Sequence, residues 1–238
     1  MSRSGSTAAL LGAIMGASVL AHGTVANSAT AGATRAVVEL FTSQGCSSCP
    51  PADAVAGRLL TDPAVIVLSF HVNYWDDLGW KDPFASQPST DRQYAYARSL
   101  GERSVFTPQL ILNGTLSLIG SQERAIRQAV AAASQAQFPV HADLAKQSDG
   151  DFALSLGGTA PGAKVWEVRY VRRAITQIQG GENRGRTLET YNNVTHMQSL
   201  GTFAPGTLKL PPLTSPDDGL AVIIQASSTG RILGAAAY

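Results

Sequence analysis

The strongest local signals in the chain lie in one run of residues, Ala36-Val37-Val38-Glu39-Leu40-Phe41-Thr42-Ser43-Gln44-Gly45-Cys46-Ser47-Ser48-Cys49-Pro50-Pro51. Residues 36–41 are mostly β-branched and apolar, which predicts a buried strand. The small and polar residues that follow predict a turn. Pro50 and Pro51 then open a helix that runs to about Leu60, because proline is tolerated in the first helical turn, where its missing N–H would be unpaired anyway.

The only two cysteines of the chain, Cys46 and Cys49, lie between this strand and this helix. A helix N-terminus lowers the pKa of a thiol, and the thiolate is the reactive form. The spacing lets the two thiols oxidise each other without a backbone movement, which favours a redox pair. A disulfide between the two cysteines closes a loop of only four residues. The loop-entropy model gives such a disulfide only roughly 2 kcal/mol of stabilisation, so a bridge that serves stability alone would be poorly placed here. A structural bridge and a metal site stay open as alternatives.

The pattern up to about residue 136 alternates strands and helices. Residues 64–70 predict a second buried strand, parallel to the first because a helix connects them. A helix is expected from about Ser89 to Leu100. Residues 109–118 predict a hairpin, since Asn113-Gly114 is a strong turn signal. A last helix is expected over residues 121–137.

From about Val140 the pattern changes to short strands separated by turn residues. The expected strands are 140–145, 151–156, 163–172, 174–178, 187–191, 193–197, 207–210, 220–226 and 231–236. This spacing predicts an antiparallel sandwich or barrel. The apolar run Val222-Ile223-Ile224 predicts a central strand.

The N-terminus resembles a secretory signal peptide. Arg3 is the only charged residue before Arg35, and residues 8–21 are apolar or small. This run is shorter than the ~20 residues of a membrane span, so we expect no stable membrane anchor. Cleavage after Ala21 or Ala31 fits the small-residue rule. We therefore expect a periplasmic or secreted protein, with its cysteines in an oxidising compartment.

The charge balance argues against one class of partner. The chain has 18 basic and 17 acidic residues, and 44% of its residues are hydrophobic. Nucleic-acid binders carry a basic surplus, so we expect no nucleic-acid partner. The composition fits globular domains rather than disorder.

A second motif, Thr107-Pro108-Gln109, precedes the predicted hairpin. The order of the elements resembles the thioredoxin superfamily: a strand, the Cys-x-x-Cys motif, a helix, this Thr-Pro motif, a hairpin and a helix that starts at Ile119-Gly120-Ser121. The motifs themselves are most similar to those of the glutaredoxins. The resemblance covers about residues 35–136 and implies a cis Pro108 facing Cys46. It implies an α/β thioredoxin-like domain over residues 32–137, after a leader of residues 1–31. An all-β antiparallel sandwich-like domain is then expected over residues 138–238.

The sequence departs from the glutaredoxins at two places. Ser47-Ser48 stand where glutaredoxins have a tyrosine between the cysteines, and residues 73–103 form an insertion, so glutathione dependence does not carry over. The chain more closely resembles an uncharacterised family of exported bacterial proteins with a thioredoxin-like part and a β-rich tail. The phrases that carry this resemblance are Glu39–Cys46, His71–Asp76, Gly79–Phe84 and Gly181–Arg186.

A polar, aromatic loop follows the second strand. Parallel strands end at the same edge of a sheet, so we expect His71, Tyr74, Trp75 and Trp80 to border the cysteines. His71 is either a base or metal ligand, or a hydrogen-bonded strand end. The aromatic residues either wall a substrate groove or fill a hydrophobic layer.

Two further features leave alternatives open. Glu39 lies in a buried strand, where an acid needs a partner. By the superfamily resemblance Glu39 is the proton acceptor of the resolving thiol, and otherwise it is a salt-bridged core residue. The loop from Gly180 to Arg186 is either a hairpin tip or a lip over the redox site.

These features favour an exported thiol–disulfide oxidoreductase-like protein. Cys46 attacks a disulfide, Cys49 resolves it, and Pro108 with Thr107 aligns the substrate. The substrate is a protein or small-molecule thiol or disulfide, and the chemistry requires no cofactor. One alternative is a metal-binding module with Cys46, Cys49 and His71 as ligands, a set that suits copper or zinc. Another is a non-catalytic interaction protein with a static disulfide.

Overall fold

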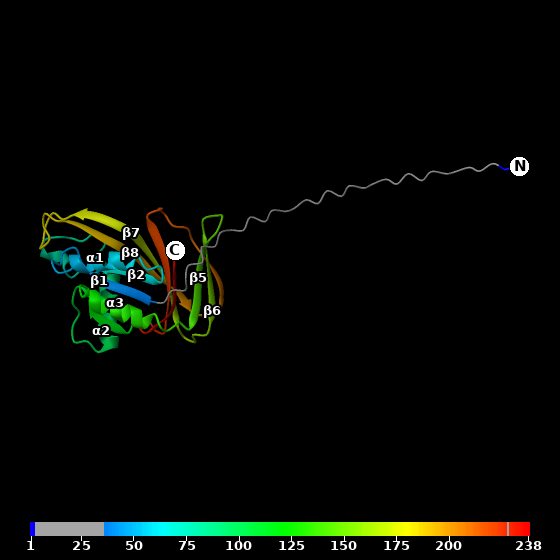
Figure 1. The fold of residues 1–238 in the computed structure, drawn as a ribbon. Coiled ribbons are helices and arrows are strands. Elements are labelled where there is room, and N and C mark those ends of the chain that lie inside the picture. The colour runs from blue at the N-terminus through cyan, green and yellow to red at the C-terminus, as the bar shows by residue number, and fades with distance from the viewer. Residues whose placement is uncertain (3–35, 228) are drawn as a thin grey trace.

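The computed structural model describes residues 1–2, 36–227 and 229–238. Figure 1 shows a large sheet with its helices, and a smaller sheet containing β5 and β6 at one end. The strands are β1 (Ala36–Thr42), β2 (Val65–His71), β3 (Gln109–Leu112), β4 (Leu116–Ile119), β5 (Val140–Lys146), β6 (Phe152–Gly158), β7 (Lys164–Gln177), β8 (Thr187–Thr202), β9 (Gly206–Leu210), β10 (Asp218–Gln225) and β11 (Ile232–Ala237). The helices are α1 (Pro50–Leu59), the 3₁₀ helix η1 (Asp76–Leu78), α2 (Gln87–Leu100) and α3 (Glu123–Ala133).

The large sheet is mixed, with eight strands in the order β11-β10-β7-β8-β2-β1-β3-β4. β1 and β2 run parallel, as predicted, and Thr42 lies opposite His71 at their carboxyl ends. The predicted hairpin is also confirmed, since β3 and β4 pair antiparallel around Asn113-Gly114. Both turn residues have positive φ angles, as a tight hairpin turn requires.

The expected fold class, an α/β thioredoxin-like domain followed by a separate antiparallel sandwich-like domain, is wrong. β8 joins the edge of β2 in parallel through Ser69 and Asn193. β7, β10 and β11 therefore continue the sheet of the first half of the chain. The physical reason is that the free edge of β2 carries unpaired backbone groups, and a strand from the second half covers it. The hydrophobic pattern predicts strands, but not which strands become neighbours.

Helices cover both faces of the sheet around β1. α1 and α3 pack on one face, where Leu40 lies in a cluster with Val55 and Ile126. α2 covers the other face, where Tyr96 lies in a cluster that also contains Ile223 of β10. A strand that is covered on both faces is buried along its whole length, and all seven residues of β1 are buried. Since the second cluster draws on both halves of the chain, the halves share one core.

The three-stranded sheet of β5, β6 and β9 packs on part of the large sheet. Phe152 and Leu154 of β6 share a cluster with Val222 and Ile224 of β10. A sandwich therefore exists only at this end of the molecule. β10 lies between β7 and β11, which confirms the predicted central strand.

β7 and β8 form one long hairpin where four short strands were predicted. They are 14 and 16 residues long, and β7 pairs with β10 only up to Val171. The outer part of the hairpin, yellow to olive in Figure 1, extends over α1. There Tyr191 packs against Gly57, whose missing side chain leaves the space: a Cβ at Gly57 would lie 2.5 Å from the tyrosine ring.

The predicted leader, residues 1–31, falls almost wholly in residues 3–35, outside the described part of the chain. None of the helices in the described part is long and apolar enough to cross a membrane.

Candidate functional site

The two cysteines lie at the junction of β1 and α1 and form a disulfide. Cys49 is the N-cap of α1, and Pro50 and Pro51 occupy its first turn, as predicted. Cys46 N–H donates to the Ser43 carbonyl at 3.2 Å, which closes the turn between strand and helix. Both cysteines are fully buried, with 0% exposure. The sulfur atoms are therefore placed at a helix N-terminus and are covered by other parts of the chain.

The Thr107-Pro108 segment lies beside the cysteine turn. Its peptide bond is cis, as the superfamily resemblance implies. Ser48 links the two segments, since its hydroxyl lies 3.3 Å from the Cys46 sulfur and 3.5 Å from the Thr107 carbonyl oxygen. Gly120 lies behind the proline, and a Cβ there would be 3.1 Å from the Pro108 Cβ. The structure thus brings Thr107 and Pro108 to the disulfide.

The aromatic loop after β2 borders the same turn. Trp75 donates its indole N–H to the Thr107 hydroxyl at 2.9 Å, and Trp80 donates to the side-chain oxygen of Gln44 at 3.0 Å. Tyr74 donates to Gln93 of α2 at 3.1 Å, and burial raises the pKa of Tyr74 to about 12. Trp75 and Trp80 therefore help to hold the site, while Tyr74 connects the loop to α2.

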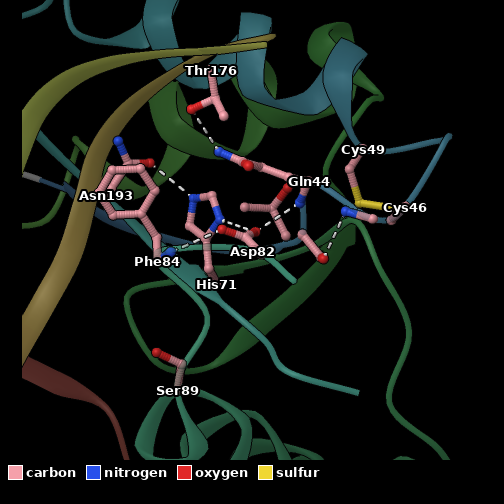
Figure 2. A network of polar contacts seen from close by, with 12 residues as sticks. Gln44, Cys46, Cys49, His71, Asp82, Phe84, Ser89, Thr176 and Asn193 are labelled. Carbon is pink, nitrogen blue, oxygen red and sulfur yellow. Dashed lines mark hydrogen bonds and ion pairs between the residues drawn. A yellow bond between two sulfur atoms is a disulfide. The ribbon is translucent and has the colours of Figure 1, made fainter. Parts of the chain in front are cut away.

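His71 is fully buried and both of its ring nitrogens have partners (Figure 2). Nδ1 lies 2.7 Å from an Asp82 carboxylate oxygen, and Nε2 lies 2.8 Å from the Asn193 side-chain oxygen. The same Asp82 oxygen accepts the Gln44 backbone N–H at 2.8 Å. His71 therefore joins β2, β8 and the cysteine turn, which favours the hydrogen-bonded strand end over the base or metal ligand.

The charges of this network support a protonated His71. Burial alone would lower the pKa of His71, but the charge and hydrogen bond of Asp82 outweigh it and raise the pKa. Burial would raise the pKa of Asp82, but the charge of His71 and several hydrogen bonds lower it. The Nδ1 atom faces the Asp82 carboxylate, whose charge favours the protonated ring, so the geometry supports an imidazolium–carboxylate pair.

Asp53 is a buried acid that the sequence reasoning missed. It lies four residues after Cys49, on the buried side of α1. Residues i and i+4 of a helix share a face, so Asp53 lies on the same side of α1 as Cys49, one helical turn further along. It accepts a 2.8 Å hydrogen bond from the Thr42 hydroxyl. Burial raises the pKa of Asp53 to about 6, against smaller lowering effects of His71 and Thr42.

Glu39 does not lie in this network. It projects toward α2, on the other face of the sheet, where Arg92 donates to it at 2.5 Å and Tyr96 at 2.6 Å. Of the two sequence-based alternatives, this position favours the salt-bridged core residue.

The loop from Gly180 to Arg186 is both a hairpin tip and a cover of the cysteine turn. Asn183 is fully buried and donates to the carbonyls of Gln44 and Cys46, both at 2.9 Å. The carboxylate of Glu182 accepts the Ser47 backbone N–H at 3.0 Å. Thr176 of β7 accepts from the Gln44 side chain at 3.1 Å. The second half of the chain therefore completes the site.

The alternative metal set gains no support from this geometry. Cys46 and Cys49 are bonded to each other, and the ring nitrogens of His71 are occupied. In the part of the chain that the structure describes, no three His, Cys, Asp or Glu side chains are placed to hold a metal ion.

Three site residues had only weak signals in the sequence. Asp53 shares the buried face of α1 with Ala52 and Val55, a face that is otherwise apolar, and an acid at such a position signals a buried role. Asp82 and Asn183 lie in the phrases Gly79–Phe84 and Gly181–Arg186, but no local pattern singles out these two side chains, because their contacts depend on strands distant in sequence.

Fold and site together define a mixed-sheet protein with a buried Cys-x-x-Cys disulfide covered by a long hairpin. The chain belongs to the DUF1223 family, described as proteins of unknown function, whose family model matches residues 37–225. The resemblance to an uncharacterised family is thus confirmed at this level.

Two solved structures are similar to this chain. Protein AGR_C_4864 from Agrobacterium tumefaciens is 33% identical, with a TM-score of 0.76, over 86% of this chain and 94% of that chain. HBP35 of Porphyromonas gingivalis is 16% identical, with a TM-score of 0.61, over 87% of this chain and 75% of that one. The second likeness concerns the fold alone. A comparison with curated proteins found no match.

Proposed function

We propose that the protein is a thiol–disulfide oxidoreductase whose redox pair is Cys46 and Cys49. One observation carries the proposal: the disulfide lies at the N-terminus of α1, with the Thr107-Pro108 segment beside it. This local arrangement is the part of the thioredoxin-superfamily resemblance that supports the proposal. A buried carboxyl, Asp53, follows one helical turn later.

The proposed reaction is a two-step exchange. A thiolate of a donor dithiol attacks the Cys46 sulfur, the Cys46–Cys49 bond breaks, and Cys49 leaves as a thiolate. The second donor thiolate then attacks the mixed disulfide and releases Cys46 as a thiolate. Two electrons pass from the donor, which becomes a disulfide, and in the reverse direction the reduced cysteine pair gives two electrons to a disulfide substrate and is itself oxidised. The N-terminus of α1 stabilises the thiolate of Cys46.

Asp53 is the group we assign to proton transfer at Cys49. Its pKa of about 6 lies near neutral pH, where a carboxyl exchanges protons effectively. Its own backbone N–H donates to the Cys49 carbonyl at 3.1 Å, which fixes the helical turn between the two residues. Asp53 thus takes the role that the sequence left open for Glu39.

The substrate class in this proposal is a protein or small-molecule thiol or disulfide, without nucleic acid and without a prosthetic cofactor. The leader predicted from the sequence supports an exported protein, in the periplasm or secreted. An oxidising compartment is where a dithiol of this kind has disulfide substrates.

A trapping experiment tests the proposal. The Cys49→Ser variant lacks the resolving thiol, so Cys46 retains a mixed disulfide with its substrate, and mass spectrometry of the exported fraction identifies the adduct. Cys46→Ser is the matched control and carries no adduct through Cys46. If neither variant forms an adduct, the oxidoreductase proposal fails.

The burial of both cysteines favours a second candidate, a non-catalytic protein with a static disulfide. Static disulfides have reduction potentials below about −300 mV, and catalytic ones lie higher. The reduction potential of the wild-type protein therefore separates the two candidates.

A further inference from the structure

The hairpin tip brings a negative charge to the cysteine turn. The carboxylate of Glu182 accepts the backbone N–H of Ser47, the residue directly after Cys46. This hydrogen bond keeps the pKa of Glu182 below its usual value, so the side chain is a carboxylate at neutral pH. The contact spans 135 residues of sequence and is built by tertiary structure alone.

Asn183 fixes the place of this charge. It is fully buried and is held by hydrogen bonds from its side-chain N–H groups to the Gln44 and Cys46 carbonyls. Its side-chain oxygen accepts from Arg186 at 2.8 Å. The tip cannot shift away from Ser47 without breaking these bonds. Asn183 therefore positions the tip, while Glu182, which is exposed, supplies the charge.

The charge acts differently on the two redox states of the cysteines. The sulfur atoms are neutral in the disulfide, whereas reduction creates a Cys46 thiolate favoured by the helix N-terminus. The Glu182 carboxylate accepts the Ser47 backbone N–H in the turn that precedes this N-terminus and adds a like charge near the thiolate. Like charges at short range disfavour each other.

We propose that the charge of Glu182 sets the redox balance of the cysteine pair, by favouring the Cys46–Cys49 disulfide over the dithiol. The inference rests on the proposed function, since it requires a disulfide that is reducible in the folded protein. Coupling between two equilibria is reciprocal. Reduction therefore weakens the hydrogen bond of Glu182 to Ser47 by the same factor, while the bonds of Asn183 keep the tip in place.

The experiment measures the equilibrium of the full chain with dithiothreitol. The dithiothreitol dithiol gives two electrons and two protons to the Cys46–Cys49 disulfide and becomes its cyclic disulfide. Alkylation and mass spectrometry then count the protein in each state. Glu182→Gln removes the charge but keeps an oxygen acceptor for the Ser47 N–H. We expect the equilibrium constant for disulfide formation to fall about three- to tenfold, and tenfold corresponds to about 30 mV.

Two further variants sharpen the result. Glu182→Lys reverses the charge, and we expect a larger shift in the same direction. Glu189→Gln is the matched control: Glu189 lies on the same hairpin, but it pairs with Arg173 at 2.5 Å. We expect the control to keep the wild-type constant. We also expect the effect of Glu182→Gln to shrink in high salt, which screens exposed charges.

The outcomes separate the inference from the proposed function. If the wild type equilibrates and Glu182→Gln has the same constant, the inference is overturned and the oxidoreductase proposal stands. If the folded wild type is not reduced at all, both are overturned. A shift in Glu189→Gln equal to that of Glu182→Gln also overturns the inference, because the effect then belongs to the hairpin and not to its tip.

Discussion

Replacing Asp53 with asparagine should stabilise the protein at neutral and alkaline pH. The pKa of Asp53 is raised from 3.8 to about 6 in the folded protein, with burial as the largest cause. A raised folded pKa gives stability that is present at low pH and lost as the pH rises through that pKa. Since one pKa unit corresponds to 1.36 kcal/mol, the charged form costs about 3 kcal/mol at pH 8.

The asparagine side chain has nearly the same shape and accepts the same hydrogen bond from Thr42, but it carries no charge at any pH. We therefore expect Asp53→Asn to exceed the wild type in unfolding free energy by about 3 kcal/mol at pH 8 and by only about half a kcal/mol at pH 4. Urea denaturation of both oxidised proteins across this range measures the difference.

The control for this experiment is Asp91→Asn, which changes an exposed carboxylate on α2. We expect it to change the unfolding free energy by less than about 0.5 kcal/mol. A constant difference between Asp53→Asn and wild type at every pH would refute the reasoning, because the effect would then not come from ionisation. The same variant should also slow reduction by dithiothreitol near pH 7, if Asp53 transfers the proton of Cys49.

Three further predictions follow from the same contacts. His71→Ala leaves the buried Asp82 carboxylate without its cation and should lower the unfolding free energy by about 3–5 kcal/mol in a denaturation experiment; a loss below about 1 kcal/mol would contradict the buried ion pair. Glu39→Gln should lower the unfolding free energy by a similar amount. The rate of disulfide reduction under native conditions should stay within about twofold of the wild-type rate. A slower reduction would indicate that Glu39, and not Asp53, transfers the proton. Gly57→Ala places a methyl group against the Tyr191 ring, so we expect a loss of about 1–3 kcal/mol and faster proteolysis of the β7–β8 tip, and unchanged proteolysis would count against the packing of the hairpin on α1.

The local elements could be predicted from the sequence, because their signals are local. The apolar run of β1, the prolines that open α1 and the Asn113-Gly114 turn each act within a few residues, and the structure has these elements near the expected positions. The parallel pairing of β1 and β2 also follows, since one helix connects them.

The sheet order could not be predicted, because it depends on one distant pairing. Ser69 of β2 and Asn193 of β8 join the two halves of the sheet, and no periodicity in either strand identifies the partner. The expected separate sandwich followed from the strand spacing of the second half alone. That expectation missed the role of β10, which packs one face into the core shared by both halves of the chain and the other face against the small sheet.

The candidate site was predictable in its centre and not in its surroundings. Cys46, Cys49 and Thr107-Pro108 are carried by two compact motifs. Asp53 and Asn183 depend on which side chains are buried, and burial is decided by packing between distant elements.

The distance along the chain between the cysteines and their cover has a consequence for the timing of oxidation. Asn183 bonds to a residue 137 positions earlier, and contacts that close so long a loop form late. At synthesis rates of about 5–20 residues per second, Cys46 and Cys49 precede their cover by on the order of ten seconds. An oxidant that meets the growing chain therefore finds the two thiols uncovered, and the arrival of the hairpin ends that interval by burying them.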